Sequence, residues 1–107
     1  MAWILLVLAG IAEVIWAVGL KYADGFSKPL PSAITLVFMG VSVWLLALAL
    51  RTIPLGTGYA IWVGIGAVGT AIAGMILFEE SRAVARIVCI LLIVAGIVGL
   101  KLTSPNP

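Results

Sequence analysis

The side chain best suited to chemistry in this sequence is the carboxylate of Glu13, which stands alone in the long apolar stretch 3–20. A lone carboxylate at bilayer depth is costly and marks a functional site by default. Removal from water disfavours its charged form, so it can exchange protons near neutral pH. It attracts a cation only when ionised, so proton and cation binding exclude each other, as an antiporter requires. The alternative is a neutral acid that donates a hydrogen bond between helices.

Gly10 and Trp16 are spaced so that both lie near Glu13 on a helix. Gly10 and Glu13 share one helix face, and Trp16 lies on its flank. Gly10 lets a partner helix or a ligand come close, and Trp16 offers an indole N–H together with a flat ring. We therefore place both residues in a substrate pocket around Glu13.

Aromatic and hydroxyl side chains from two other apolar stretches complete the candidate pocket. Tyr59 and Trp62 are three residues apart and face the same way on a helix. Two aromatic rings near a carboxylate favour a bound cation. Ser42 lies near the middle of its stretch, where its hydroxyl can orient Glu13 or bind an N–H group of a ligand. The alternative for Ser42 is a hydrogen bond back to its own helix.

Small residues indicate where helices bend or pack closely. Gly64 and Gly66 occupy the middle of a glycine-rich stretch, which favours either a hinge or close helix packing. Ala95 and Gly99 form a small-xxx-small pair, a pattern typical of a dimer-packing face. We therefore predict a hinge at the first pair and dimer packing at the second, with close packing as the alternative at the glycines.

The composition indicates an integral membrane protein. Hydrophobic residues make up 64% of the chain and charged residues only 9%, whereas a soluble domain has about a quarter of its residues charged. No basic cluster is present to follow a phosphate backbone, which argues against nucleic-acid binding. The chain has no histidine and a single cysteine, Cys89, which we interpret as a small core hydrophobe. We expect no metal, no cofactor and no enzyme active site.

Four apolar stretches of membrane-spanning length position these residues. They cover residues 3–20, 31–50, 56–78 and 84–101, and short polar connections separate them. We predict an all-α membrane protein in which residues 1–107 form a single four-helix transmembrane domain. The last residues, 102–107, are expected to form a short frayed tail.

One chain of this size is too small to enclose a translocation path with two closed ends, so we expect an oligomer. Basic residues fall at both ends of the predicted spans: Lys21, Lys28, Arg82 and Arg86 at one end, Arg51 and Lys101 at the other. The positive-inside rule gives such a chain only a weak bias. It can therefore insert both ways round and pair as an antiparallel, dual-topology dimer. The alternative is one orientation with a small bias.

Several short motifs spread over the chain carry family information. They are Ala12-Glu13-Val14, Lys21 with Gly25-Phe26, Pro31-Ser32, and Tyr59-Ala60-Ile61-Trp62 followed by Gly64. Together they resemble the small multidrug resistance transporter family over essentially the whole chain. Trp16, Ser42 and the glycine run that begins at Gly64 resemble the guanidinium-exporter branch of that family. Gly58 and Val63 depart from the usual pattern beside the aromatic motif, which bears on fine selectivity.

The resemblance implies an antiparallel dimer in the bacterial inner (plasma) membrane, surrounded by lipid, that exchanges protons for guanidinium or small guanidinyl cations. Glu13 would bind proton and cation alternately, and Trp16, Ser42, Tyr59 and Trp62 would line the pocket. Several alternatives remain open. The chain could export substituted guanidinyl or quaternary ammonium compounds, belong to a heterodimeric transporter, serve a lipid-carrier flippase, or be an assembly subunit of a larger membrane complex.

Overall fold

A computed structural model describes residues 1–104 as four α-helices, with no strand in that part of the chain. The helices are α1 (Ala2–Ala23), α2 (Pro29–Ala49), α3 (Leu55–Leu77) and α4 (Val84–Thr103). All four are long and apolar enough to cross a membrane. The all-α membrane architecture is thereby confirmed, while the assignment of residues 1–107 to one domain stays a prediction.

Helices α1 and α4 extend beyond the ends of their predicted spans, whereas α2 and α3 each end one residue earlier than predicted. Helix α1 continues three residues past the expected end at residue 20, to Ala23. Helix α4 continues to Thr103, so the tail predicted to begin at residue 102 is wrong for its first two residues. The reason is that Lys101 does not end the helix, since a cation is favourable beside the last carbonyls. The rest of the expected tail, residues 105–107, lies outside the described residues.

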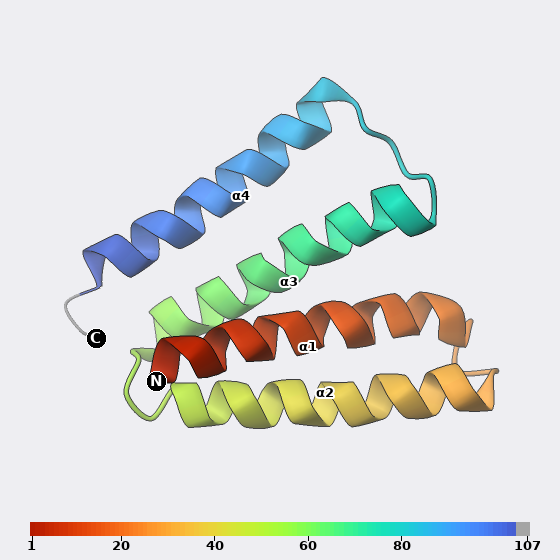
Figure 1. Cartoon of the computed structure of the whole chain (residues 1–107), viewed down its shortest axis with the longest axis horizontal. Helices are drawn as coiled ribbons and strands as arrows, with labels where there is room; N and C mark the ends of the chain where they lie inside the picture. The colour runs from red at the N-terminus through yellow and green to blue at the C-terminus, as the bar shows by residue number, and fades with distance from the viewer. Residues whose placement is uncertain (105–107) are drawn as a thin grey trace.

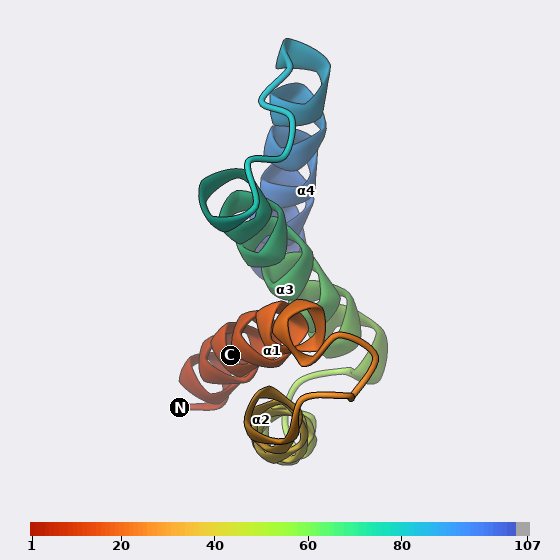
Figure 2. The same ribbon diagram turned by 90° about the vertical axis from the view of Figure 1, so that its right-hand side faces the viewer.

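The four helices lie side by side in a single layer. Their order across the layer is α2, α1, α3, α4, as Figures 1 and 2 show from two directions. The molecule measures 44 × 34 × 17 Å, and its thin dimension is about one and a half times the diameter of one helix, which is about 10–12 Å. A layer of this kind has no enclosed interior, so one chain does not surround a path across the membrane.

Helix α1 occupies the centre of the layer because its small residues admit both neighbours. On the α2 side, a Cβ on Gly19 would overlap the Thr35 side chain. On the α3 side, a Cβ on Gly10 would overlap Ile65. Lipid provides no hydrophobic force between helices, so such close backbone approach is what holds them together.

Helix α4 is attached to the layer through α3. Ile93 and Ile97 pack over Gly64, where a Cβ would lie 2.8 Å from the Ile97 side chain. At the far end, the Lys101 ammonium lies 4.6 Å from the centre of the Trp3 ring, which brings the end of α4 to the start of α1 (Figure 1). None of the residues of α4 is buried. Cys89 is therefore exposed, and its interpretation as a core residue is wrong, because α3 is the only described helix whose backbone lies close to that of α4.

Candidate functional site

Glu13 lies in the central helix, with its carboxylate directed at α3. The closest approach is to Gly66, where a Cβ would overlap the carboxylate of Glu13. The next residue of α1, Val14, fits in the same manner over Gly69, about one turn further along α3. Glycine at these positions of α3 therefore makes the space that the Glu13 side chain fills.

Three buried side-chain atoms of α1 have no hydrogen-bond partner among the described residues. One is Nε1 of Trp3 near the start of the helix, and the other two are Oε1 of Glu13 and Nε1 of Trp16. The two residues are three apart and so lie on neighbouring positions of one helix surface. Buried polar groups are nearly always paired, so unpaired ones call for an explanation such as a ligand or ion. The acceptor on Glu13 and the donor on Trp16 can together hold a polar ligand.

Ser42 and Trp62 meet at a single backbone carbonyl of α1. The Ser42 hydroxyl donates to the carbonyl oxygen of Ala9 at 2.6 Å. The Trp62 indole N–H donates to Ser42 Oγ at 2.9 Å and to the same carbonyl at 3.3 Å. Ala9 precedes Glu13 by one helical turn. These bonds tie α2 and α3 to the part of α1 that carries Glu13.

This arrangement corrects one interpretation of Ser42. Its hydroxyl does not bond back to its own helix, because it donates to α1 instead. It is fully buried beside Trp62, and its described hydrogen bonds do not include Glu13. Sequence spacing could not reveal this partner, since it is a backbone atom of another helix. The membership of Ser42 in a substrate pocket stays a prediction.

The aromatic pair is half enclosed. The rings of Tyr59 and Trp62 have centroids 5.4 Å apart and are tilted by 59°. Trp62 is buried, whereas Tyr59 is 52% exposed. The shared face expected from their spacing is present, but one chain leaves Tyr59 open on one side.

The remaining predicted residues take part in helix packing or lie open. Gly10 packs under Ile65, while Gly64 and Gly66 accommodate side chains from α4 and α1. Helix α3 runs unbroken through both glycines. Close packing therefore accounts for them in this structure, and a hinge there stays a prediction. Ala95 is exposed, and nothing lies within 4 Å of a Cβ on Gly99, so the dimer-packing face also stays a prediction.

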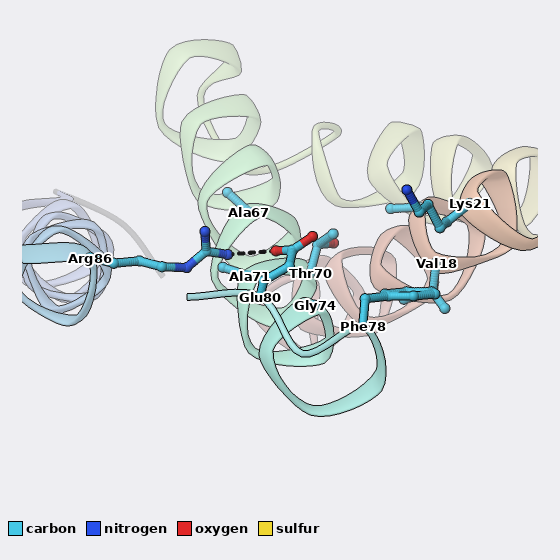
Figure 3. Close-up of a pocket in the computed structure, with 10 residues that line it drawn as sticks. Val18, Lys21, Ala67, Thr70, Ala71, Gly74, Phe78, Glu80 and Arg86 are labelled. Carbon is cyan, nitrogen blue, oxygen red and sulfur yellow. Dashed lines mark hydrogen bonds and ion pairs between the residues drawn. The ribbon is translucent and has the colours of Figure 1, made fainter. Parts of the chain in front are cut away.

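Sequence reasoning missed a cavity of about 370 Å³ beyond Glu13, toward the α3–α4 connection. Its polar lining comes from Lys21, Thr70, Glu80 and Arg86, with Phe78 at its edge (Figure 3). Glu80 and Arg86 form an ion pair of 2.8 Å. Their separation of six residues spans a loop and a helix start, so no helical spacing rule predicts the pair.

The described residues contain no group of three His, Cys, Asp or Glu side chains that could hold a metal.

Four helices of membrane-spanning length and apolarity, one of which carries a carboxylate, indicate an integral membrane protein. The model of the Small Multidrug Resistance protein family matches residues 1–93. The chain belongs to this family.

Characterised relatives match along nearly their whole length. The chain is 62% identical over 104 residues to the guanidinium exporter of Yersinia pseudotuberculosis serotype I (strain IP32953), which covers 97% of this chain and 100% of that protein. It is 57% identical to the guanidinium exporter of Salmonella typhimurium (strain LT2) and 55% identical to that of Citrobacter freundii, each over 97% of this chain and 99% of the relative. The resemblance seen in the sequence motifs is thereby confirmed.

The hydrogen bonds at Ala9 predict a difference between two serines of α2. Ser42→Ala removes both the donor to Ala9 and the acceptor for Trp62, and is expected to destabilise the protein by about 1 kcal/mol. Ser32→Ala is the matched control, because the Ser32 hydroxyl has no partner among the described residues. Thermal unfolding in detergent measures both variants. Equal melting temperatures would show that the Ser42 bonds contribute nothing.

Proposed function

We propose that this chain is a proton-coupled antiporter that exports guanidinium or small guanidinyl cations, with Glu13 as the shared binding group. The observation that carries the proposal is the buried Glu13 oxygen, which has no donor among the described residues of its own chain. A proton or a cation can supply that missing partner, and each excludes the other. The names of the relatives support guanidinium as the cation.

Guanidinium suits this position chemically. It is planar, permanently charged and presents paired N–H donors that match a carboxylate two at a time. The Trp16 indole N–H, also unpaired, can hold the carboxylate in place from the flank. The ring of Tyr59, half exposed beside Trp62, offers an aromatic surface to the cation.

A dimer supplies what a single layer of helices lacks. The flat shape of the chain supports this, because a second copy is needed to close a path around Glu13. Helix α4 supports it too, since no residue of α4 is buried in the single chain. Ala95 and Gly99 lie on this helix and would pack against the partner. We expect an antiparallel homodimer in the bacterial inner membrane with two Glu13 carboxylates, and a heterodimer is the alternative.

The first of three predictions about transport concerns the role of Glu13. In liposomes that hold only the purified chain, an outward guanidinium gradient should drive proton uptake, and Glu13→Gln should reduce this flux to the level of protein-free liposomes. The amide keeps the shape but can neither ionise nor attract the cation. A pH-sensitive dye inside the vesicles measures the flux. Glu79→Gln is the control, because Glu79 is exposed in the α3–α4 connection.

Three outcomes would contradict this proposal. Full exchange by Glu13→Gln would assign the residue a structural role. No exchange by the parent chain, with quaternary ammonium ions moved instead, would support the multidrug alternative, and no exchange of either would point to a missing partner subunit.

The second prediction concerns selectivity. Trp16 limits the room beside Glu13, so Trp16→Gly is expected to admit bulkier guanidinyl and quaternary ammonium cations that the parent excludes. Trp44→Gly is the control, because Trp44 is 61% exposed and far less enclosed by the chain. Competition of each cation with guanidinium uptake gives the readout. An unchanged substrate range in Trp16→Gly would show that another group sets the pocket size.

The third prediction tests the contact between Glu13 and Gly66. The Cβ of Gly66→Ala would overlap the carboxylate and push it away, while alanine favours the helix. We expect a loss of exchange of about tenfold or more with the fold retained, since small displacements of reacting groups are costly. Gly40→Ala is the control, because nothing lies within 4 Å of its Cβ. Normal exchange by Gly66→Ala would show that the carboxylate does not need this position.

A further inference from the structure

The cavity beyond Glu13 continues the line along which α1 and α3 meet. On α1 its wall is formed by Ala17 and Lys21, one and two turns past Glu13. On α3 it is formed by Thr70 and Gly74, one and two turns past Gly66. The cavity therefore lies between the Glu13 carboxylate and the end of the layer where α3 connects to α4.

Backbone geometry brings a second carboxylate into this cavity. Glu79 adopts a left-handed conformation with φ 52°, which reverses the chain after α3. The amide N–H of Glu80 then donates to the carbonyl of Gly74 at 3.2 Å. A Cβ on Gly74 would overlap the Glu80 carboxylate, so this side chain lies flat against α3. A left-handed backbone conformation is energetically costly for a glutamate. At Glu79 this conformation directs the next residue, Glu80, back over the cavity.

The occupant of this carboxylate is itself a guanidinium group, that of Arg86 (Figure 3). A single N–H, on Nη2, reaches Oε1 of Glu80 at 2.8 Å. Nε, one of the two guanidinium nitrogens that could complete a paired contact beside Nη2, is buried without a partner among the described residues. Both side chains remain partly exposed, 34% for Arg86 and 46% for Glu80, so the pair adds little stability. Arg86 thus occupies a guanidinium-binding carboxylate without satisfying it.

We infer that this cavity is a second cation site, in which a guanidinyl cation on its way to or from Glu13 replaces Arg86 on the Glu80 carboxylate. The inference rests on the proposed transport of guanidinyl cations. A free guanidinium can make the two parallel bonds that Arg86 does not make. Thr70 offers a hydroxyl to its remaining N–H groups.

Two other cations keep this site weak. Lys21 lines the same cavity, with its ammonium 5.9 Å from the centre of the Phe78 ring. Arg86 stays nearby after it is displaced and competes for the same carboxylate. Like charges close together oppose further positive charge. The site therefore passes a cation on rather than storing it.

The experiment measures binding of radiolabelled guanidinium to the purified full chain with Glu13→Gln, which removes the central site. One weak binding site is expected to remain. Adding Glu80→Gln should abolish it. Adding Arg86→Gln should tighten it about fivefold, because removal of a partly exposed competitor has an effect of that size. Adding Glu79→Gln is the matched control and should change nothing, since Glu79 does not line the cavity.

The opposite signs of two variants separate this inference from a structural role. Glu80→Gln and Arg86→Gln break the same ion pair, so a purely structural pair predicts the same change for both. Equal effects, or no guanidinium binding once Glu13 is replaced, would overturn the second site. If the Glu13→Gln chain fails to fold, the same variants are made with Glu13 present: Glu80→Gln should raise the KM for guanidinium and Arg86→Gln should lower it.

The two proposals fail in different ways. Failure of the proposed function appears as a parent chain that exchanges no guanidinium for protons in liposomes. Failure of the second site appears as a parent chain that transports normally, while Glu80→Gln and Arg86→Gln leave both binding and KM unchanged.

Discussion

The structure depends on the close approach of α1 and α3. Lipid tails are as apolar as the helix surfaces, so helices associate through packing rather than through a hydrophobic force. Gly10 on α1, with Gly66 and Gly69 on α3, removes the Cβ atoms that would hold the two backbones apart. This contact places the carboxylate of Glu13 against the bare backbone at Gly66, with one of its oxygens buried. Without the glycines, the same carboxylate would need another position, and the line of the cavity beyond it would be lost.

The polar groups of the layer divide into two kinds. At Ala9, the Ser42 hydroxyl and the Trp62 indole satisfy each other and a backbone carbonyl, which fixes three helices relative to one another. One turn further along α1, Glu13 and Trp16 each bury an atom without a partner in the described chain. A satisfied network gives rigidity, whereas an unsatisfied group is costly unless a ligand completes it. The rigid part therefore positions the part that is left free to bind.

The length and apolarity of each stretch predicted the four helices, and helical spacing predicted that Tyr59 and Trp62 face the same way, because both properties are local. The partner of Ser42, the exposure of Cys89 and the Glu80–Arg86 pair were not predicted. Each depends on which helices become neighbours or on the path of a loop, and a single sequence does not record either. The left-handed conformation of Glu79 is an example of a loop geometry that could not be predicted, since glutamate gives no sign of that conformation. Glu13 is predicted to be functional because a lone charge in an apolar span has few structural uses, and its role stays a prediction.

Helix α4 is attached to the layer less firmly than the other three helices, and this affects how the carboxylates of Glu13 and Glu80 are connected. Three helices meet at Ala9 and hold Glu13, whereas among the described helices only α3 has its backbone close to that of α4. Arg86 belongs to α4, and Glu80 is held against the last turns of α3. The ion pair therefore links the loosely attached helix to the fixed part of the layer. A shift of α4 against α3 would change the occupancy of Glu80 and leave the surroundings of Glu13 in place. In the proposed mechanism the two sites are therefore altered separately, the Glu80 site by the position of α4 and the Glu13 site by protonation.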